Sequence, residues 1–121
     1  MPRNLTFRRW LFPCSLLLLL ACSEEDKRPD DLIPEEEMAK ILADIHMAEA
    51  QVTNLQLRSL DSSVTVYEAL QQKIWKKYKV DTLLYRKSYS FYTSHPTYLA
   101  EIYEQVEKNL DRREKKKKVK P

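Results

Sequence analysis

Residues 38–55 read MAKILADIHMAEAQVTNL, and their apolar side chains recur at spacings of three and four. Such spacing gathers them on one face of an α-helix, which turns once in about 3.6 residues. Pro34 suits the first helical position, and the acidic residues 35–37 favour the positive end of the helix dipole. The sequence therefore predicts an amphipathic helix from Pro34 to about Leu60. Its apolar face comprises Met38, Ile41, Leu42, Ile45, Ala48, Val52 and Leu55.

A second helix is expected over about residues 63–78. Asp61-Ser62-Ser63 interrupts the apolar pattern and supplies oxygens that can cap a helix. Residues 64–67, VTVY, also have the propensity of a strand, which leaves the start of this helix open. The expected inward side chains are Val66, Tyr67, Leu70, Ile74 and Tyr78, with Trp75 near the edge of the stripe.

Two more helices precede the strongly basic end of the chain. Asp81 is a suitable cap for a helix over about residues 82–93, and Pro96 both ends that helix and starts the next. Beyond Leu110 only Val119 is apolar, so residues 111–121 are expected to form a basic tail that is frayed or disordered. The inward residues are Leu84, Tyr85, Ser88, Tyr89 and Tyr92, then Leu99, Ile102, Tyr103, Val106 and Leu110.

Together these elements predict an all-α fold, a small bundle of three to four amphipathic helices over residues 34–110. The chain contains no glycine. Phosphate-binding loops, dinucleotide-binding turns and tight hairpins all depend on glycine, so the composition argues against nucleotide sites and most compact β folds.

The first 22 residues have the features of a secretion signal. Three arginines precede an apolar run, LFPCSLLLLLA, that is about half of the roughly 20 residues needed to span a bilayer. The run ends in Leu19-Leu20-Ala21-Cys22, which resembles the bacterial lipobox. Residues 1–21 are then a signal peptide, and Cys22 becomes a lipidated first residue whose acyl chains, palmitate among them, anchor the protein. The alternative is an ordinary signal or membrane anchor with an incidental cysteine.

Residues 22–33 are rich in charge and are expected to form a flexible tether. The acidic cluster after Cys22, residues 23–27, resembles the surface-export signal of Bacteroidetes lipoproteins; a merely solvated tether is the alternative. The expected location is the cell envelope, lipid-anchored in the outer membrane, at either the cell surface or the periplasmic face. Cys14 is removed with the signal peptide, so neither a disulfide nor thiol catalysis is expected.

The charge of the chain is unevenly distributed. The formal net charge of +3 comes from Arg3, Arg8 and Arg9, so the chain from residue 22 onward is neutral. Basic residues concentrate after residue 107 and acidic residues predominate before it. The Lys115–Lys118 run suits anionic lipid, lipopolysaccharide or an acidic protein surface. The alternatives are a solvated tail and a helical tail that folds back on the acidic body. Nucleic acid is not an expected partner, because the signal directs the protein out of the cytoplasm.

The tyrosines are the main candidates for a binding surface, because tyrosine combines apolar area with a polar tip. The proposed surface consists of Tyr85, Tyr89, Tyr92, Tyr103, His95 and His46. The alternative is a small core that places tyrosines at its rim.

Four polar residues are candidates for chemistry. His46 and Glu49 are three apart on one helix and could form a metal or proton-transfer pair, or His46 could border the core and hydrogen-bond a neighbouring helix. His95 is expected to cap the last helix or bond a backbone carbonyl, and Ser88 to allow close helix packing. Because no nucleophile, base and oxyanion donor occur together, we expect no catalytic residues, no metal, no cofactor and no enzymatic activity.

Two blocks resemble a family of Bacteroidetes envelope lipoproteins of unknown function. The resemblance covers roughly residues 30–110 and implies a lipid-anchored, all-helical protein, with no catalytic residues to carry over. The first block is Asp31-Leu32-Ile33-Pro34, Met38 and Ile41-Leu42-Ala43-Asp44-Ile45-His46; the second is Tyr85, Ser88-Tyr89, Tyr92, His95-Pro96, Leu99, Ile102-Tyr103 and Val106.

From the sequence we expect a non-enzymatic interaction or accessory lipoprotein of the outer membrane, bound to the membrane through its acyl chains and to an envelope protein. The alternative is a module that binds a small ligand or a glycan in a tyrosine-rich helical groove.

Overall fold

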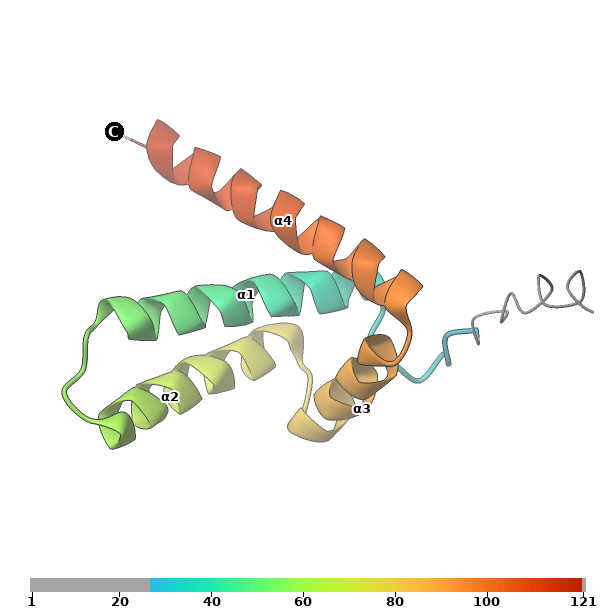
Figure 1. Cartoon of the computed structure of the whole chain (residues 1–121), viewed down its shortest axis with the longest axis horizontal. Helices are drawn as coiled ribbons and strands as arrows, with labels where there is room; N and C mark the ends of the chain where they lie inside the picture. The colour runs from blue at the N-terminus through green and yellow to red at the C-terminus, as the bar shows by residue number, and fades with distance from the viewer. Residues whose placement is uncertain (1–26, 121) are drawn as a thin grey trace, which may run out of the picture.

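The computed structural model describes residues 27–120, and within them it contains four α-helices and no strand. α1 spans Glu35–Asn54, α2 Leu60–Tyr78, α3 Thr82–Thr93 and α4 Pro96–Val119. α1 is central: α2 runs back alongside it and α4 crosses it (Figure 1). α3 is a short helix at the end of the bundle where α1 begins. The all-α prediction is confirmed. The expected signal peptide, residues 1–21, and Cys22 lie outside the described residues.

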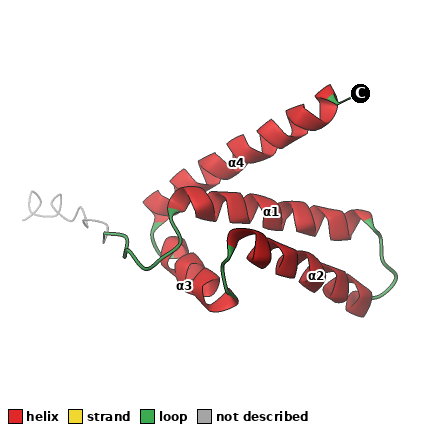
Figure 2. Cartoon of the chain, turned by 180° about the vertical axis from the view of Figure 1, so that it is seen from behind, coloured by secondary structure: helices red, strands yellow, loops and turns green. Residues whose placement is uncertain are grey.

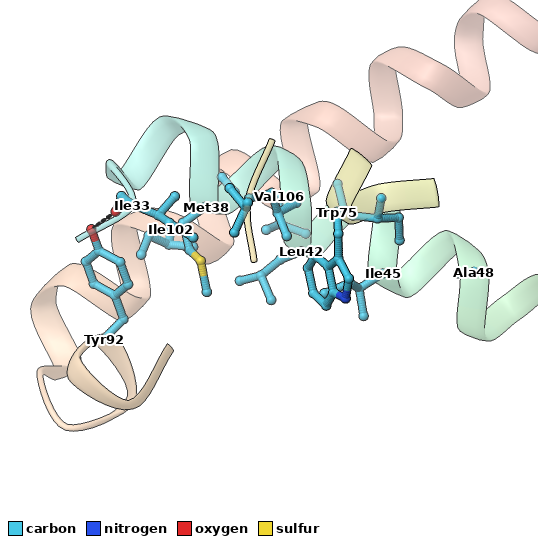
Figure 3. Packing of buried hydrophobic residues seen from close by; sticks show 14 residues of the cluster. Ile33, Met38, Leu42, Ile45, Ala48, Trp75, Tyr92, Ile102 and Val106 are labelled. Atoms are coloured by element: carbon cyan, nitrogen blue, oxygen red, sulfur yellow. Dashed lines mark hydrogen bonds between the residues drawn. The ribbon is translucent and has the colours of Figure 1, made fainter. Parts of the chain in front are cut away.

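The hydrophobic core forms along one face of α1 (Figure 3). α2 adds Ile74 and Trp75, and α3 adds Tyr92. α4 contributes Ile102 and Val106, both of which are buried. The α1 stripe is buried as predicted from Met38 to Ala48, where the buried residues are Met38, Ala39, Ile41, Leu42, Ala43, Ile45 and Ala48.

The junction of α1 and α2 differs from the prediction. α1 ends at Asn54 instead of continuing to about Leu60, and Gln56 adopts a left-handed conformation with φ of 46°. α2 then begins at Leu60, where the Ser59 hydroxyl accepts a hydrogen bond from the Ser62 N–H (3.2 Å). The expected caps at residues 61–63 therefore lie inside the first turn, and the strand-like residues 64–67 are helical because Tyr67 packs on the core.

α4 is longer than predicted. It begins at Pro96 as expected but continues to Val119, so the expectation of a frayed tail from residue 111 is wrong for the described part of that segment. Arginine, lysine and glutamate are good helix formers. An ion pair between Lys118 and Glu114 (2.8 Å) supports the last turns, and Arg113 pairs with Asp44 on α1. Lysines in the last turn also interact favourably with the helix dipole.

The second half of the expected tether is part of the folded body. Leu32 and Ile33 are buried, and the backbone N–H and carbonyl of Ile33 both form hydrogen bonds with side chains of α3. Its N–H donates to Ser88 Oγ (2.9 Å), and its carbonyl accepts a hydrogen bond from the Tyr92 hydroxyl (2.6 Å). We call residues 28–33 the strap. Its two apolar side chains explain why it docks instead of remaining free.

Candidate functional site

Four aromatic side chains gather on one side of the bundle, and we call Tyr85, Tyr89, Tyr103 and His46 the aromatic patch. The Tyr85 and Tyr89 rings stack with centroids 5.8 Å apart, and the His46 and Tyr103 centroids are 6.2 Å apart. Trp75 supports the patch from below, with its ring 4.9 Å from that of Tyr85. Tyr89 is 37% exposed and Tyr103 is 38% exposed. The patch thus presents two accessible tyrosines on a packed aromatic base.

The close packing of the patch raises the pKa of two of its tyrosines, Tyr85 and Tyr103. Burial, followed by the nearby hydroxyls of Tyr89, Tyr67 and Tyr103, raises the pKa of Tyr85 well above its usual value. Burial also raises the pKa of Tyr103, and Tyr89 raises it further through its charge and a hydrogen bond. Neutral hydroxyls at physiological pH can donate and accept hydrogen bonds, which suits a contact surface.

Two residues predicted for this surface lie elsewhere. Tyr92 is 0% exposed and uses its hydroxyl to hold the strap, so its assignment to the surface is wrong. His95 stacks on Phe91 with centroids 3.9 Å apart, outside the aromatic patch. Its Nδ1 lies 2.7 Å from the Phe91 carbonyl oxygen, which confirms the predicted carbonyl contact, while its side chain makes no capping hydrogen bond to α4.

The polar candidates form local contacts. His46 Nδ1 lies 3.3 Å from Glu49 Oε2 on the same helix, so the two share a face as predicted. Within residues 27–120 no group of three or more potential ligands is placed to hold a metal ion. Ser88 is fully buried and its hydroxyl donates to the Leu84 carbonyl (2.8 Å) while accepting from the strap. The structure thus places Ser88 at a packing contact.

Asp44 is a site residue that sequence reasoning did not single out. Its carboxylate accepts hydrogen bonds from Lys77 Nζ (2.7 Å) and the Tyr78 hydroxyl (2.9 Å) on α2, and it pairs with Arg113 on α4. The side chain is only 12% exposed. Burial opposes its ionisation, but the hydrogen bonds from Lys77, Arg113 and Tyr78 outweigh that effect and lower its pKa. An acidic residue inside the apolar run ILADI was the signal available in the sequence.

Beside Asp44 lies an open groove of about 700 Å³, bounded by α1, α2 and the last turns of α4. Its lining combines aliphatic side chains with Lys73, Lys77, Arg113 and Lys117, and we call it the basic groove. Tyr85, Tyr89 and Tyr103 are absent from its lining, so the aromatic patch and the basic groove are separate features. Asp44 and His46 are two residues apart on α1, which directs them to nearly opposite sides of the helix.

Within residues 27–120 no helix has the length and apolar content that a membrane span requires.

Comparison with known proteins adds one relationship. No curated protein and no solved structure matches the chain. Residues 29–116, which include all of α1, α2 and α3 and most of α4, match a family described as a domain of unknown function, DUF4296. The chain belongs to the DUF4296 family.

Proposed function

We propose that this protein is a lipid-anchored lipoprotein of the outer membrane of a Bacteroidetes cell, where it serves as a non-enzymatic interaction or accessory subunit of an envelope assembly. The observation that carries the proposal is the aromatic patch, in which Tyr89 and Tyr103 stand accessible and side by side on different helices. Exposed tyrosines on a rigid base are favoured in protein interfaces, because they bury apolar area and keep a polar tip.

The anchor is supported by the motif at Leu19–Cys22, and the strap limits its reach. Six peptide steps separate Cys22 from Arg28, whose N–H lies 3.2 Å from the Tyr98 hydroxyl at the start of α4. At about 3.5 Å per residue, these steps extend at most roughly 20 Å. An acylated Cys22 would hold the helical body close to the membrane surface.

The anchor is tested by the variant Cys22→Ser expressed in the native host. We expect the protein to move from the membrane pellet to the soluble fraction, because the thiol that accepts the acyl chain is gone. A variant that lacks lipid and still sediments as firmly with the membrane would refute the anchor.

The patch is tested by the double variant Tyr89→Ala with Tyr103→Ala, compared with Leu83→Ala, a more accessible apolar site on α3 that is 78% exposed. Affinity capture from native membranes is expected to lose its partner with the tyrosine variant and to retain it with Leu83→Ala. If both variants capture the same proteins as the wild type, the patch is not the interface. The ligand-binding alternative lacks comparable support, since the patch tyrosines line no part of the basic groove.

A further inference from the structure

The basic groove has the layout of a helical bundle that lacks one helix. α1 packs against both α2 and α4, and α4 diverges from α1 toward its C-terminus (Figures 1 and 2). No residue of α3 lines the space that this divergence opens. Along α1 and its C-cap residue, the groove extends from Asp44 to Leu55. At a rise of about 1.5 Å per residue this is about 17 Å, the length of roughly three helical turns.

The floor of the groove, between its two basic walls, is mostly aliphatic and also includes Gln51 and Asn54. Ala48 and Ala50 come from α1, and Leu70 and Ile74 come from α2. Leu55 at the open end is 49% exposed. Alanine lets a neighbouring helix approach closely, and helices in such contacts lie about 8–10 Å apart between axes. The floor therefore suits the apolar stripe of an added helix.

The two walls carry cations at helical spacing. Lys73 and Lys77 are four apart on α2, and Arg113 and Lys117 are four apart on α4. Lys77 and Arg113 already pair with Asp44, whereas Lys73 and Lys117 form no ion pair with any described residue from 27 to 120. The groove thus offers one accessible lysine on each wall, with a mostly apolar strip between them.

From this arrangement we propose that the basic groove binds an acidic amphipathic helix of a partner protein. The apolar stripe of the helix lies on the Ala48–Leu55 floor, and carboxylates on its two flanks meet Lys73 on one wall and Lys117 on the other. One free lysine on each wall, with a mostly apolar floor between them, complements a helix whose apolar stripe is flanked by carboxylates on both sides. This interface is distinct from the aromatic patch and does not depend on it.

The test uses two synthetic helical peptides of about three to four turns and the purified full chain. Both peptides have leucine at i, i+3, i+4 and i+7; one carries glutamate on both flanks and the other carries lysine. Fluorescence anisotropy is expected to show binding of the glutamate peptide and on the order of tenfold weaker binding of the lysine peptide. Lys73→Glu with Lys117→Glu should reverse this preference. Lys76→Glu with Lys116→Glu, which changes the same charge on the same helices outside the groove, should leave it unchanged.

Circular dichroism of each double variant establishes that its helices remain intact. The proposal is overturned if both peptides bind equally well, or if charge reversal at Lys73 and Lys117 has no effect. It is also overturned if these lysines are needed only for binding to vesicles that contain phosphatidylglycerol, which would make the groove a lipid site. A dimer detected by light scattering, and lost in the same variant, would assign the groove to a second copy of this chain.

Discussion

Asp44 joins three helices through a single carboxylate. It lies within the apolar stretch of α1, yet it contacts Lys77 and Tyr78 on α2 and Arg113 on α4. A buried charge with satisfied partners is costly to disturb, because removing one side leaves the others without compensation. The residue thereby fixes how α2 and the last turns of α4 are placed about α1, and with them the width of the basic groove.

Asp44→Asn is expected to lower the free energy of unfolding at neutral pH by about 1–3 kcal/mol, since it removes a charge-assisted set of hydrogen bonds. The folded protein depresses the pKa of Asp44, so this contribution is present above the usual value of 3.8 and is lost as pH falls through the depressed pKa. Urea unfolding from pH 7 downward should therefore show wild type and variant converging at acidic pH.

The matched control is Asp31→Asn, whose carboxylate pairs with Lys87 at an exposed site. Its effect on the free energy of unfolding should be much smaller than that of Asp44→Asn, because solvent screens an exposed ion pair. If the free energy of unfolding differed between wild type and Asp44→Asn by the same amount at every pH, this would contradict the role assigned to the charge of Asp44.

Tyr92→Phe is expected to destabilise the fold by about 1–3 kcal/mol, because the buried Ile33 carbonyl loses its donor. Tyr89→Phe, at an accessible position, should change stability by no more than about 0.5 kcal/mol. Thermal or urea denaturation monitored by circular dichroism measures both. Equal effects of the two substitutions would mean that the hydrogen bond from Tyr92 to the Ile33 carbonyl contributes nothing to stability.

At the scale of elements, the helix ends show how a chain without glycine closes its turns. α2 ends at Lys79, whose φ of 54° and ψ of 39° lie in the left-handed region, and Gln56 after α1 has a φ of 46°. A residue with a Cβ adopts this conformation at a cost of about 1–2 kcal/mol. The absence of glycine therefore did not exclude left-handed caps in this fold; the packing of α2 on α1 sustains them.

Lys79→Gly is expected to stabilise the protein by about 0.5–1 kcal/mol, because glycine adopts the left-handed conformation without steric cost. Lys76→Gly, inside α2, should instead destabilise it by about 1 kcal/mol. Opposite shifts of the urea midpoint check both effects. A loss of stability with Lys79→Gly would mean that the left-handed turn carries little strain.

The elements that could be predicted from sequence are those with local signals. Asp81 caps α3 with a hydrogen bond from the Leu84 N–H (2.7 Å), and Pro96 starts α4, both as expected. The end of α1 could not be read in this way, because Leu55 continues the apolar spacing although the helix ends at Asn54.

The candidate site was less predictable, because tertiary packing decides which of the predicted side chains stay accessible. Tyr89 and Tyr92 occupy one predicted stripe, yet one is accessible and the other is buried against the strap. The partners of Asp44 lie 33 to 69 positions away in the chain, so no local pattern identifies them. The sequence thus named the four side chains of the aromatic patch, but it also named Tyr92 and His95, which packing places elsewhere.

At the scale of the whole molecule, stability is expected to decrease along α4. α1 is buried by α2 and α4, whereas the residues of α4 from Glu114 onward are exposed. Amides in regions with few buried contacts exchange through local opening at low free-energy cost.

Native-state hydrogen exchange should therefore show the slowest amides at Ile41–Ile45 and fast exchange over residues 114–119, with intermediate rates in α3. Mass spectrometry with peptide-level resolution measures this gradient. Uniform protection along α4 would show that its last turns are held by contacts as extensive as those of α1.

The strap also determines how the fold responds to mechanical load. The N–H of Ile33 donates a hydrogen bond to Ser88 and its carbonyl accepts one from Tyr92, and both of these side chains belong to α3. Tension applied from the N-terminal side meets the contacts of Arg28 with Tyr98 and of Asp31 with Lys87, and then these two hydrogen bonds, before it reaches α1. We therefore expect the strap to separate from α3 before α1 unfolds when the chain is pulled from its N-terminal side.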